Sequence, residues 1–277
     1  MAPNNADACL LTERCLIRVS GEDAMSFLQN LVTNDMTRLV PGQLLYACLL
    51  TPQGRFLHDL FISRDNGGFF LECETSRRED LIRRLSIFKL RARVMIEDYS
   101  SRANVYVSTS LPMEGACFQD PRLTELGYRF YLPKSTPSFS TVPPDQHHDQ
   151  RIGLGVPEGS TDIKPEKDLL AHVNLDYLHA VSWDKGCYVG QEITAMTENR
   201  GVIKKRMVIV SGKGLIAGDI LMHNGHEVGD VRSVNSLRTQ GLAVLKLSSL
   251  EIPGMIIRRT GESVTARLPE WLHLGVP

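Results

Sequence analysis

The chain has 277 residues, of which 42% are hydrophobic and 23% charged, and this balance predicts folded globular domains and excludes a disordered chain. A formal net charge of −1 excludes a general electrostatic attraction to nucleic acids or anionic membranes. No apolar run approaches the roughly 20 residues that span a bilayer. We therefore expect no direct nucleic-acid partner and no membrane partner.

The N-terminal residues 1–8 have neither a basic stretch followed by an apolar core nor an Arg- and Ser-rich composition. The sequence thus predicts no secretory signal and no mitochondrial presequence. We expect a cytoplasmic protein, or one of the mitochondrial matrix if the source is eukaryotic.

The first hundred residues mix helical and strand patterns, which predicts an α+β fold. A helix is expected over 24–31, with Ser20 as its N-cap, and a second over 76–90. Strands are expected at 16–19, 44–50, 55–63, 69–73 and 91–97.

The middle of the chain predicts a second, smaller α+β unit, with strands at 104–108 and 128–132. Residues 134–149 are rich in Pro, Ser and Thr and are expected to form a surface loop. This loop carries His147 and His148, which would need distant partners to bind a metal. A short helix is expected over 151–156, and 162–176 is expected to be extended.

From residue 207 onward, short β-rich runs alternate with Gly-containing turns, which predicts an all-β C-terminal domain. The expected strands are 207–210, 220–222, 227–231, 242–247, 255–259 and 263–267.

The six cysteines are scattered and form no C-x-x-C pair, which argues against a structural zinc site. A disulfide framework is not expected in a chain of this size and compartment. Cys48 and Cys73 lie in apolar strand-like runs and are expected to be buried.

The most informative segment is Lys185–Glu192, in which Gly186 and Gly190 bracket Cys187. Glycines permit tight turns, and a nearby cation favours the reactive thiolate. The segment therefore predicts a turn that presents a thiol beside Lys185.

Three interpretations of Cys187 stay open. It can be a small buried residue, a redox-active or cluster-handling thiol, or a nucleophile that needs a base, for which His172 and His179 are close in sequence.

The residues near Cys187 also have more than one possible role. Lys185 can activate the thiol, bind an anionic group or be solvated. Tyr188 and Trp183 can stack on a flat ring or belong to the core. Gln191 and Glu192 can cap backbone amides or line a cavity.

Lys185–Glu192 resembles the K-G-C-[YF]-x-G-Q-E signature of the folate-binding YgfZ family, which includes bacterial YgfZ and mitochondrial counterparts in iron–sulfur cluster assembly. The resemblance covers most of the chain. It continues in Phe27–Asp35, Gly54-Arg55 with Asp59, Asn174–Asp176, Thr194 and Arg200-Gly201.

The family is similar to the aminomethyltransferase T-protein of the glycine cleavage system. The resemblance implies a ring-like arrangement of two α+β domains and a C-terminal β-barrel, with tetrahydrofolate in a central cavity. The expected domains are 1–98, which binds folate, 99–203, which ends in the motif and can interleave with the first, and 204–277, the barrel.

Two differences from the T-protein count against aminomethyltransferase activity. The T-protein has two aspartates where this chain has His58-Asp59, and it has a pterin-binding glutamate where this chain has His172. A neutral imidazole cannot accept the two hydrogen bonds that a carboxylate can.

The resemblance implies a tetrahydrofolate-binding accessory protein for iron–sulfur cluster assembly or repair, with Cys187 as its functional thiol. Its expected partners are folate and either iron–sulfur assembly proteins or client [4Fe-4S] enzymes, among them enzymes that modify tRNA. One thiol cannot hold a four-cysteine cluster alone. The expected folate-binding residues are Asn34, Asp35, Arg55, Asp59, His172, Lys185, Gly186, Tyr188, Gln191 and Glu192.

Two alternatives remain. One is a folate-dependent, aminomethyltransferase-like one-carbon transferase. The other is a binding module that senses folate, in which Cys187 would be dispensable.

Overall fold

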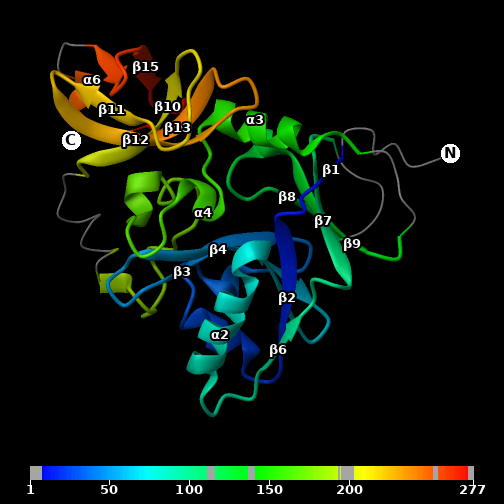
Figure 1. Ribbon diagram of the computed structural model, residues 1–277. Coiled ribbons are helices and arrows are strands. Elements are labelled where there is room, and N and C mark those ends of the chain that lie inside the picture. Colours follow the sequence, from blue (N-terminus) through cyan, green and yellow to red (C-terminus); the bar gives the residue numbers. More distant parts are fainter. Residues whose placement is uncertain are drawn as a thin grey trace. The chain divides into compact units, whose positions relative to one another are not determined.

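The computed structural model describes residues 8–110, 116–136, 141–192, 194, 203–251 and 255–273 (Figure 1). The chain divides into two compact units, Met1–Pro144 with Leu178–Ile193, and Asp145–Tyr177 with Thr194–Pro277. Both units are discontinuous in sequence. As a result, Lys185–Glu192 folds with the N-terminal part of the chain.

A five-stranded antiparallel sheet forms the centre of the first unit, in the order β3-β4-β5-β2-β6. Its strands are β2 (Arg14–Ser20), β3 (Leu44–Leu50), β4 (Phe56–Asp65), β5 (Gly68–Glu74) and β6 (Met95–Asp98). All five were predicted, although β6 begins four residues later than expected. The α+β class of this part of the chain is confirmed.

One face of this sheet is covered by α1 (Ala24–Gln29) and α2 (Arg78–Lys89). Alternate strand residues such as Ile17, Leu60 and Leu71 pack there against Leu28 and Leu81. Residues one position away point to the opposite face. Cys48 and Cys73 are buried as predicted.

The start of α1 differs from the prediction. Asp23, not Ser20, occupies the N-cap position, and Ser20 is the last residue of β2. The Asp23 carboxylate accepts a hydrogen bond from the backbone N–H of Arg93 at 2.8 Å. The cap thus ties α1 to the segment that follows α2 instead of closing on its own first turn.

A second antiparallel sheet in the first unit has the order β1-β7-β9-β8. The sequence predicted its two central strands and missed the two short outer ones. Its strands are β1 (Cys9–Leu10), β7 (Ala103–Ser108), β8 (Ala116–Gln119) and β9 (Tyr128–Pro133). Single-turn 3-10 helices connect the strands of this unit: η1 (Met36–Arg38), η2 (Thr75–Arg77) and η3 (Thr124–Leu126).

The second unit begins within α3 (Pro144–Leu154), which corrects the last part, 144–149, of the loop predicted over 134–149. Proline suits the first turn of a helix, where its missing N–H is not needed. The face that α3 buries carries His147, Arg151 and Ile152. Arg151 forms a buried ion pair with Asp162, so this face has no apolar period that the sequence could reveal.

A closed barrel completes the second unit, in the strand order β10-β13-β12-β11-β14-β15. Each of its strands was predicted to within a few residues. They are β10 (Lys205–Ser211), β11 (Ile220–His223), β12 (His226–Val234), β13 (Gln240–Lys246), β14 (Ile256–Arg258) and β15 (Ser263–Arg267). The short helices of this unit are α4 (Gly159–Asp162), η4 (Leu170–Val173) and α6 (Ser248–Glu251). Within the described ranges, no helix is long and apolar enough to cross a membrane.

Candidate functional site

The segment 178–192, here called the thiol loop, packs against the turn that follows α1. The hydroxyl of Thr33 donates to the carbonyl of Ala180 at 2.6 Å. The backbone N–H of Ser182 donates to the carbonyl of Thr33 at 3.1 Å. Two backbone groups of the loop, the Ala180 carbonyl and the Ser182 N–H, are therefore fixed by the hydroxyl and the carbonyl of the buried Thr33.

Asn34 and Asp35 support this contact from the N-terminal side. The Asn34 amide nitrogen donates to the carbonyl of His179 at 2.7 Å and to that of Tyr46 at 2.8 Å. The Asp35 carboxylate accepts from the backbone N–H of Thr37 and caps η1. Both residues therefore have structural partners within the first unit.

The pKa of Asp35 reflects this capping role. Burial raises the pKa of its carboxyl group, but the hydrogen bonds from Thr37 and from the Gln29 side chain outweigh burial and hold it below its usual value. The carboxylate thus stays charged where it caps η1.

Lys185 anchors the middle of the thiol loop. Its ammonium group is buried and donates to the carbonyls of Gln29, Val32 and Asn34 at 2.7, 2.7 and 2.8 Å. Carbonyls at the end of a helix lack helical partners and attract positive charge. Burial lowers the pKa of Lys185 to about 8. The ammonium is thus directed at the end of α1, whereas the alternatives from sequence were activation of the thiol, binding of an anionic group, or solvation.

Gly190 fixes the end of the thiol loop against the β3–β4 turn. Its φ is +86°, and a Cβ atom added there would lie 2.6 Å from the carbonyl oxygen of Thr51. Gly186 differs, because an added Cβ meets nothing within 4 Å. Of the two glycines that bracket the cysteine, Gly190 is required by the backbone, and Gly186 occupies open space.

Tyr188 and Gln191 reinforce the loop from within. The Tyr188 ring is 8% exposed, and the Lys185 ammonium lies 5.0 Å from its centroid, at the distance of a cation–π contact. The Gln191 side chain donates to the carbonyl of Lys185 at 3.4 Å. Both side chains therefore pack inside the loop, whereas Trp183 is 40% exposed.

Cys187 is exposed on this fixed loop, so the interpretation that it is a small buried residue is wrong. All six cysteines lie in the described part of the chain, and each of the others is buried or half-buried. Gly186 and Glu192 are exposed as well. Among the described ranges, no group of three or more His, Cys, Asp or Glu residues could hold a metal ion, so Cys187 is not part of such a group there.

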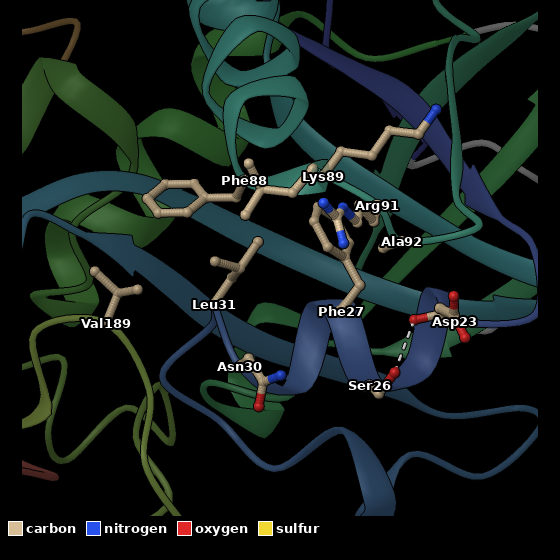
Figure 2. Close-up of a pocket in the computed structure, with 11 residues that line it drawn as sticks. Asp23, Ser26, Phe27, Asn30, Leu31, Phe88, Lys89, Arg91, Ala92 and Val189 are labelled. Carbon is tan, nitrogen blue, oxygen red and sulfur yellow. Dashed lines mark hydrogen bonds between the residues drawn. The ribbon is translucent and has the colours of Figure 1, made fainter.

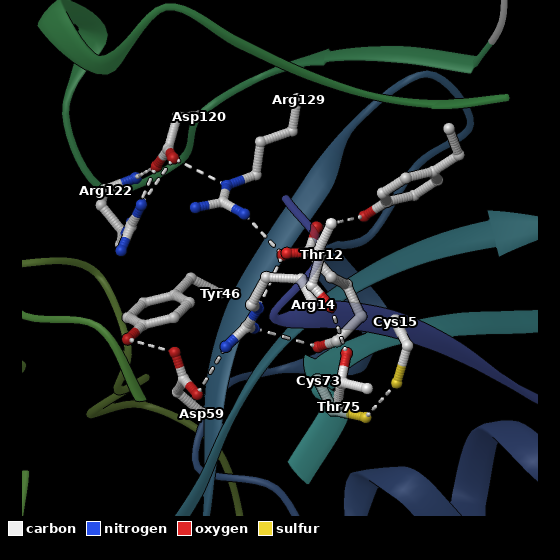
Figure 3. A network of polar contacts seen from close by, with 12 residues as sticks. Thr12, Arg14, Cys15, Tyr46, Asp59, Cys73, Thr75, Asp120, Arg122 and Arg129 are labelled. Atoms are coloured by element: carbon white, nitrogen blue, oxygen red, sulfur yellow. Dashed lines mark hydrogen bonds and ion pairs between the residues drawn. The ribbon is translucent and has the colours of Figure 1, made fainter. Parts of the chain in front are cut away.

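Asp59 lies on the sheet face opposite α1 and α2, in a buried network of charges (Figure 3). Its carboxylate accepts from the Arg14 guanidinium at 3.0 Å and from the Tyr46 hydroxyl at 3.4 Å. Arg14 also donates to Glu72 at 2.9 Å. The side chains of Arg14 and Asp59 are each 1% exposed. Asp59 is therefore shielded from solvent, and the charge of its carboxylate is balanced by Arg14.

The network continues into the second sheet of the first unit through Arg129, which is paired with Glu72 and with Asp120. Asp120 also binds Arg122 at 2.8 Å. Burial raises the pKa of the Asp120 carboxyl, but these two guanidinium groups lower it to about 2. Together, Arg14, Asp59, Glu72, Asp120, Arg122 and Arg129 form the buried charge network.

Of the six residues in the buried charge network, only Asp59 was predicted from the sequence as a site residue. The available signal was the presence of Arg14, Glu72 and Arg129 in strands that are mostly apolar. Charged residues seldom occupy buried positions unless they are paired. Three such positions could have indicated a buried ion-pair cluster, two of them in the paired strands β2 and β5 and one in β9 of the second sheet.

His58 and Asp59 do not form a pair, because adjacent strand residues point to opposite faces. His58 lies on the face that carries α2, and its Nε2 is 2.9 Å from the Asp80 carboxylate. Burial, aided by Arg77, lowers the pKa of His58 to about 4 despite this contact.

Two further predicted site residues, Arg55 and His172, are distant from Cys187 in sequence. Arg55 is half-buried in the first unit, and its backbone N–H donates to the Thr51 hydroxyl at 3.1 Å. His172 belongs to the second unit and is half-buried in η4.

Comparisons with known proteins bear on the identity of the chain. The model of the GCVT N-terminal domain matches residues 12–107, and that of the CAF17 C-terminal beta-barrel domain matches residues 204–274. The iron–sulfur cluster assembly factor IBA57, mitochondrial, of Homo sapiens is 31% identical over 306 residues, which cover 95% of this chain and 85% of that protein. The chain belongs to the IBA57 family.

The Mus musculus IBA57 protein is 32% identical and covers 94% of this chain and 84% of its own length. The glycine cleavage aminomethyltransferase T of Bartonella henselae superposes with a TM-score of 0.77 at 16% identity, over 97% of this chain and 87% of that one. This likeness confirms the predicted fold class. Within the broader T-protein-like group, the comparisons support the IBA57 branch and leave a specific relation to YgfZ as a prediction.

Proposed function

We propose that this member of the IBA57 family supports iron–sulfur cluster assembly or repair, with Cys187 as its functional thiol. The observation that carries the proposal is the exposure of Cys187 on a loop whose flanking residues are fixed. Lys185 and Gly190 bind the loop to the end of α1 and to the β3–β4 turn. A thiol held in this way keeps its position without being covered by protein.

In this proposal Cys187 supplies one ligand of a cluster and does not hold the cluster alone. A [4Fe-4S] cluster needs about four thiolate ligands. Among the described residues, Cys187 belongs to no group of three or more His, Cys, Asp or Glu side chains that could hold a metal ion. The remaining ligands would come from a partner, either an assembly protein or a client [4Fe-4S] enzyme. Any effect on tRNA modification would be indirect, through such clients.

The alternative of a one-carbon transferase is less well supported. A carboxylate that acts as a general base must reach the proton that it removes. Asp59 is 1% exposed and held by Arg14, so it does not meet this requirement. His58, which stands where the T-protein has its other aspartate, points to the opposite face.

Tetrahydrofolate binding forms a second part of the proposal, and the fold supports it. Asp59 does not fit the role of a pterin ligand, since Arg14 and Tyr46 already occupy its oxygens. His172 supplies an imidazole where the pterin edge would require a carboxylate. A folate molecule would therefore depend on other residues, and the cluster role of Cys187 does not require it.

The relatives named above are mitochondrial proteins, so we propose the mitochondrial matrix as the location if the source is eukaryotic. Otherwise the cytoplasm stays the expected compartment.

Removal of the protein from its own cells tests the cluster role. The activity of an enzyme that carries a [4Fe-4S] cluster should fall severalfold, and the activity of an enzyme without a cluster should stay unchanged. Equal activity of the cluster enzyme in both strains would reject the proposal.

Calorimetric titration of the reduced protein with tetrahydrofolate tests the folate part separately. Saturable binding by both the wild type and Cys187→Ser would establish a folate site that is independent of the thiol. Absence of binding by both proteins would withdraw the folate assignment and leave the cluster role intact.

A further inference from the structure

A groove of about 480 Å³ lies between α1 and the C-terminal end of α2, next to the thiol loop (Figure 2). Phe27 and Leu31 contribute one wall, and Phe88 contributes another. Figure 2 shows Phe88 and Leu31 facing each other beside Val189, which belongs to the thiol loop. This volume lies within the range of about 300–1,000 Å³ found for binding pockets. We call it the α1–α2 groove.

Exposed apolar side chains are concentrated at the C-terminal end of α2 and in the residues that follow it. Four of the ten large hydrophobic residues that are exposed in the described ranges fall between residues 87 and 95: Ile87, Phe88, Leu90 and Met95. Leu90 is 87% exposed. Two of these four, Phe88 and Leu90, line the α1–α2 groove, and exposed apolar side chains that gather at one place mark interaction sites more often than single ones do.

Leu90 also has a strained backbone. It follows the last residue of α2 with φ of +44° and ψ of −111°. Helices that end with positive φ usually place glycine there, because other residues are unfavourable in this region. Strained backbone of this kind tends to occur at functional sites. The chain thus presents a large apolar side chain where local stability favours glycine.

The charge on the rim is positive. Lys89 and Arg91 line the groove, and neither forms an ion pair with any residue in the described ranges. Asp23, the acidic residue of the groove, is already engaged, because its carboxylate accepts from the Arg93 backbone at 2.8 Å and lies 3.6 Å from its guanidinium group. The apolar walls therefore meet two cations whose charge is not balanced locally.

We propose that the α1–α2 groove binds an acidic amphipathic helix of a partner protein. Its apolar side chains would fill the space between Phe27, Leu31 and Phe88, and its carboxylates would pair with Lys89 and Arg91. The lining comes from helices and a loop, so the groove suits a docked helix better than an added strand.

The position of the groove connects the docked helix to the thiol. Val189 lines the groove, and Cys187 is two residues away, at most about 7 Å along the backbone. A partner that docks here therefore has the exposed thiol within reach. The inference rests on the proposed function in one respect, namely that the partner is the cluster protein that uses Cys187.

A peptide experiment tests the binding itself. The probe is a fluorescent 18-residue helical peptide of Leu and Glu, compared with a twin in which Lys replaces Glu. The acidic peptide should bind saturably and at least tenfold tighter than its twin, with affinity that falls at high salt. Leu90→Asp and the double variant Lys89→Glu/Arg91→Glu should each weaken binding at least tenfold.

Matched controls come from exposed residues of the second unit. Leu237→Asp and Lys213→Glu/Arg238→Glu make the same changes at exposed positions and should leave binding unchanged. Equal binding of both peptides, or equal effects of groove and control variants, would overturn the proposal. Self-association of the protein that Leu90→Asp abolishes would overturn it too, because the occupant would then be a second copy.

An experiment in cells tests the docking inference separately from the proposed function. Leu90→Asp should lower the activity of [4Fe-4S] enzymes severalfold while the Cys187 thiol still reacts with a thiol reagent at the wild-type rate. If Cys187→Ser loses activity and Leu90→Asp retains it, the docking inference fails and the proposed function stands. If Cys187→Ser retains full activity, the proposed function fails, and the peptide data alone decide whether the groove is a binding site.

Discussion

The ammonium nitrogen of Lys185 lies 2.7 Å from the carbonyl oxygen of Val32, across 153 positions of sequence. This contact binds the residue two positions before Cys187 to the end of α1. The same nitrogen reaches the carbonyls of Gln29 and Asn34. One side chain therefore completes a helix terminus and sets the position of the thiol loop.

Lys185→Met should destabilise the protein by about 2 kcal/mol, because three carbonyls, two of them in buried contacts, lose a charged donor. Urea unfolding measures the change through the shift in midpoint. The control is Lys134→Met, which removes an exposed lysine from the same unit and should cost less than about 0.5 kcal/mol. Equal losses in the two variants would show that Lys185 is not a structural cap.

The two glycines beside Cys187 should respond differently to alanine. Gly190→Ala adds a Cβ close to the Thr51 carbonyl at a residue with positive φ, and we expect a loss of about 2 kcal/mol or more. Gly186→Ala meets no neighbour and should change stability by less than about 0.5 kcal/mol. Thermal unfolding of both variants checks this difference, and a larger loss for Gly186→Ala would contradict the described loop.

Removal of Arg14 should be costly, because it leaves the carboxylates of Asp59 and Glu72 with less compensation in a buried site. We expect Arg14→Met to lose about 3–5 kcal/mol. Arg38→Met, which breaks an exposed ion pair with Asp184, should lose less than about 1 kcal/mol. Chemical denaturation compares the two, and a small loss for Arg14→Met would refute the buried charge network.

His58 should make stability fall in mild acid. Its pKa is about 4 in the folded chain and near 6.5 when unfolded, so between these values the unfolded chain binds a proton that the folded chain does not. Stability from this group is complete above pH 6.5 and is lost as the pH falls toward 4, by roughly 3 kcal/mol in all.

Urea midpoints measured from pH 7 to pH 4 test this dependence. His58→Gln keeps a hydrogen-bonding side chain near Asp80 without a group that titrates in this range. Its midpoint should fall less steeply over the same interval. An identical slope in both proteins would assign the acid sensitivity to other groups.

Much of the architecture could be predicted from local patterns. A continuous apolar run predicted the strand Leu44–Leu50 with its observed bounds, and short β-rich runs between regular turns predicted the barrel. Most of helix α3 was not predicted, because its buried face holds Arg151, paired with Asp162, in place of an apolar residue. That ion pair cannot be recognised from the sequence.

The candidate site was only partly accessible to sequence reasoning. The glycine-rich motif singled out Cys187, and the family resemblance gave it a role. The target of Lys185 lies on a segment 151–156 residues away, so local sequence could not reveal it. The opposite orientations of His58 and Asp59 follow from strand alternation, whereas the comparison with the T-protein had considered the two residues together, in place of its two aspartates.

The most direct test of the central claim is the activity of a [4Fe-4S] enzyme in cells that carry Cys187→Ser as their sole copy, at matched protein levels. Cys117→Ser is the control, since this cysteine is half-buried in the second sheet of the same unit. We predict severalfold loss with Cys187→Ser and wild-type activity with Cys117→Ser. Full activity with Cys187→Ser would contradict the account and favour a binding module in which the thiol is dispensable.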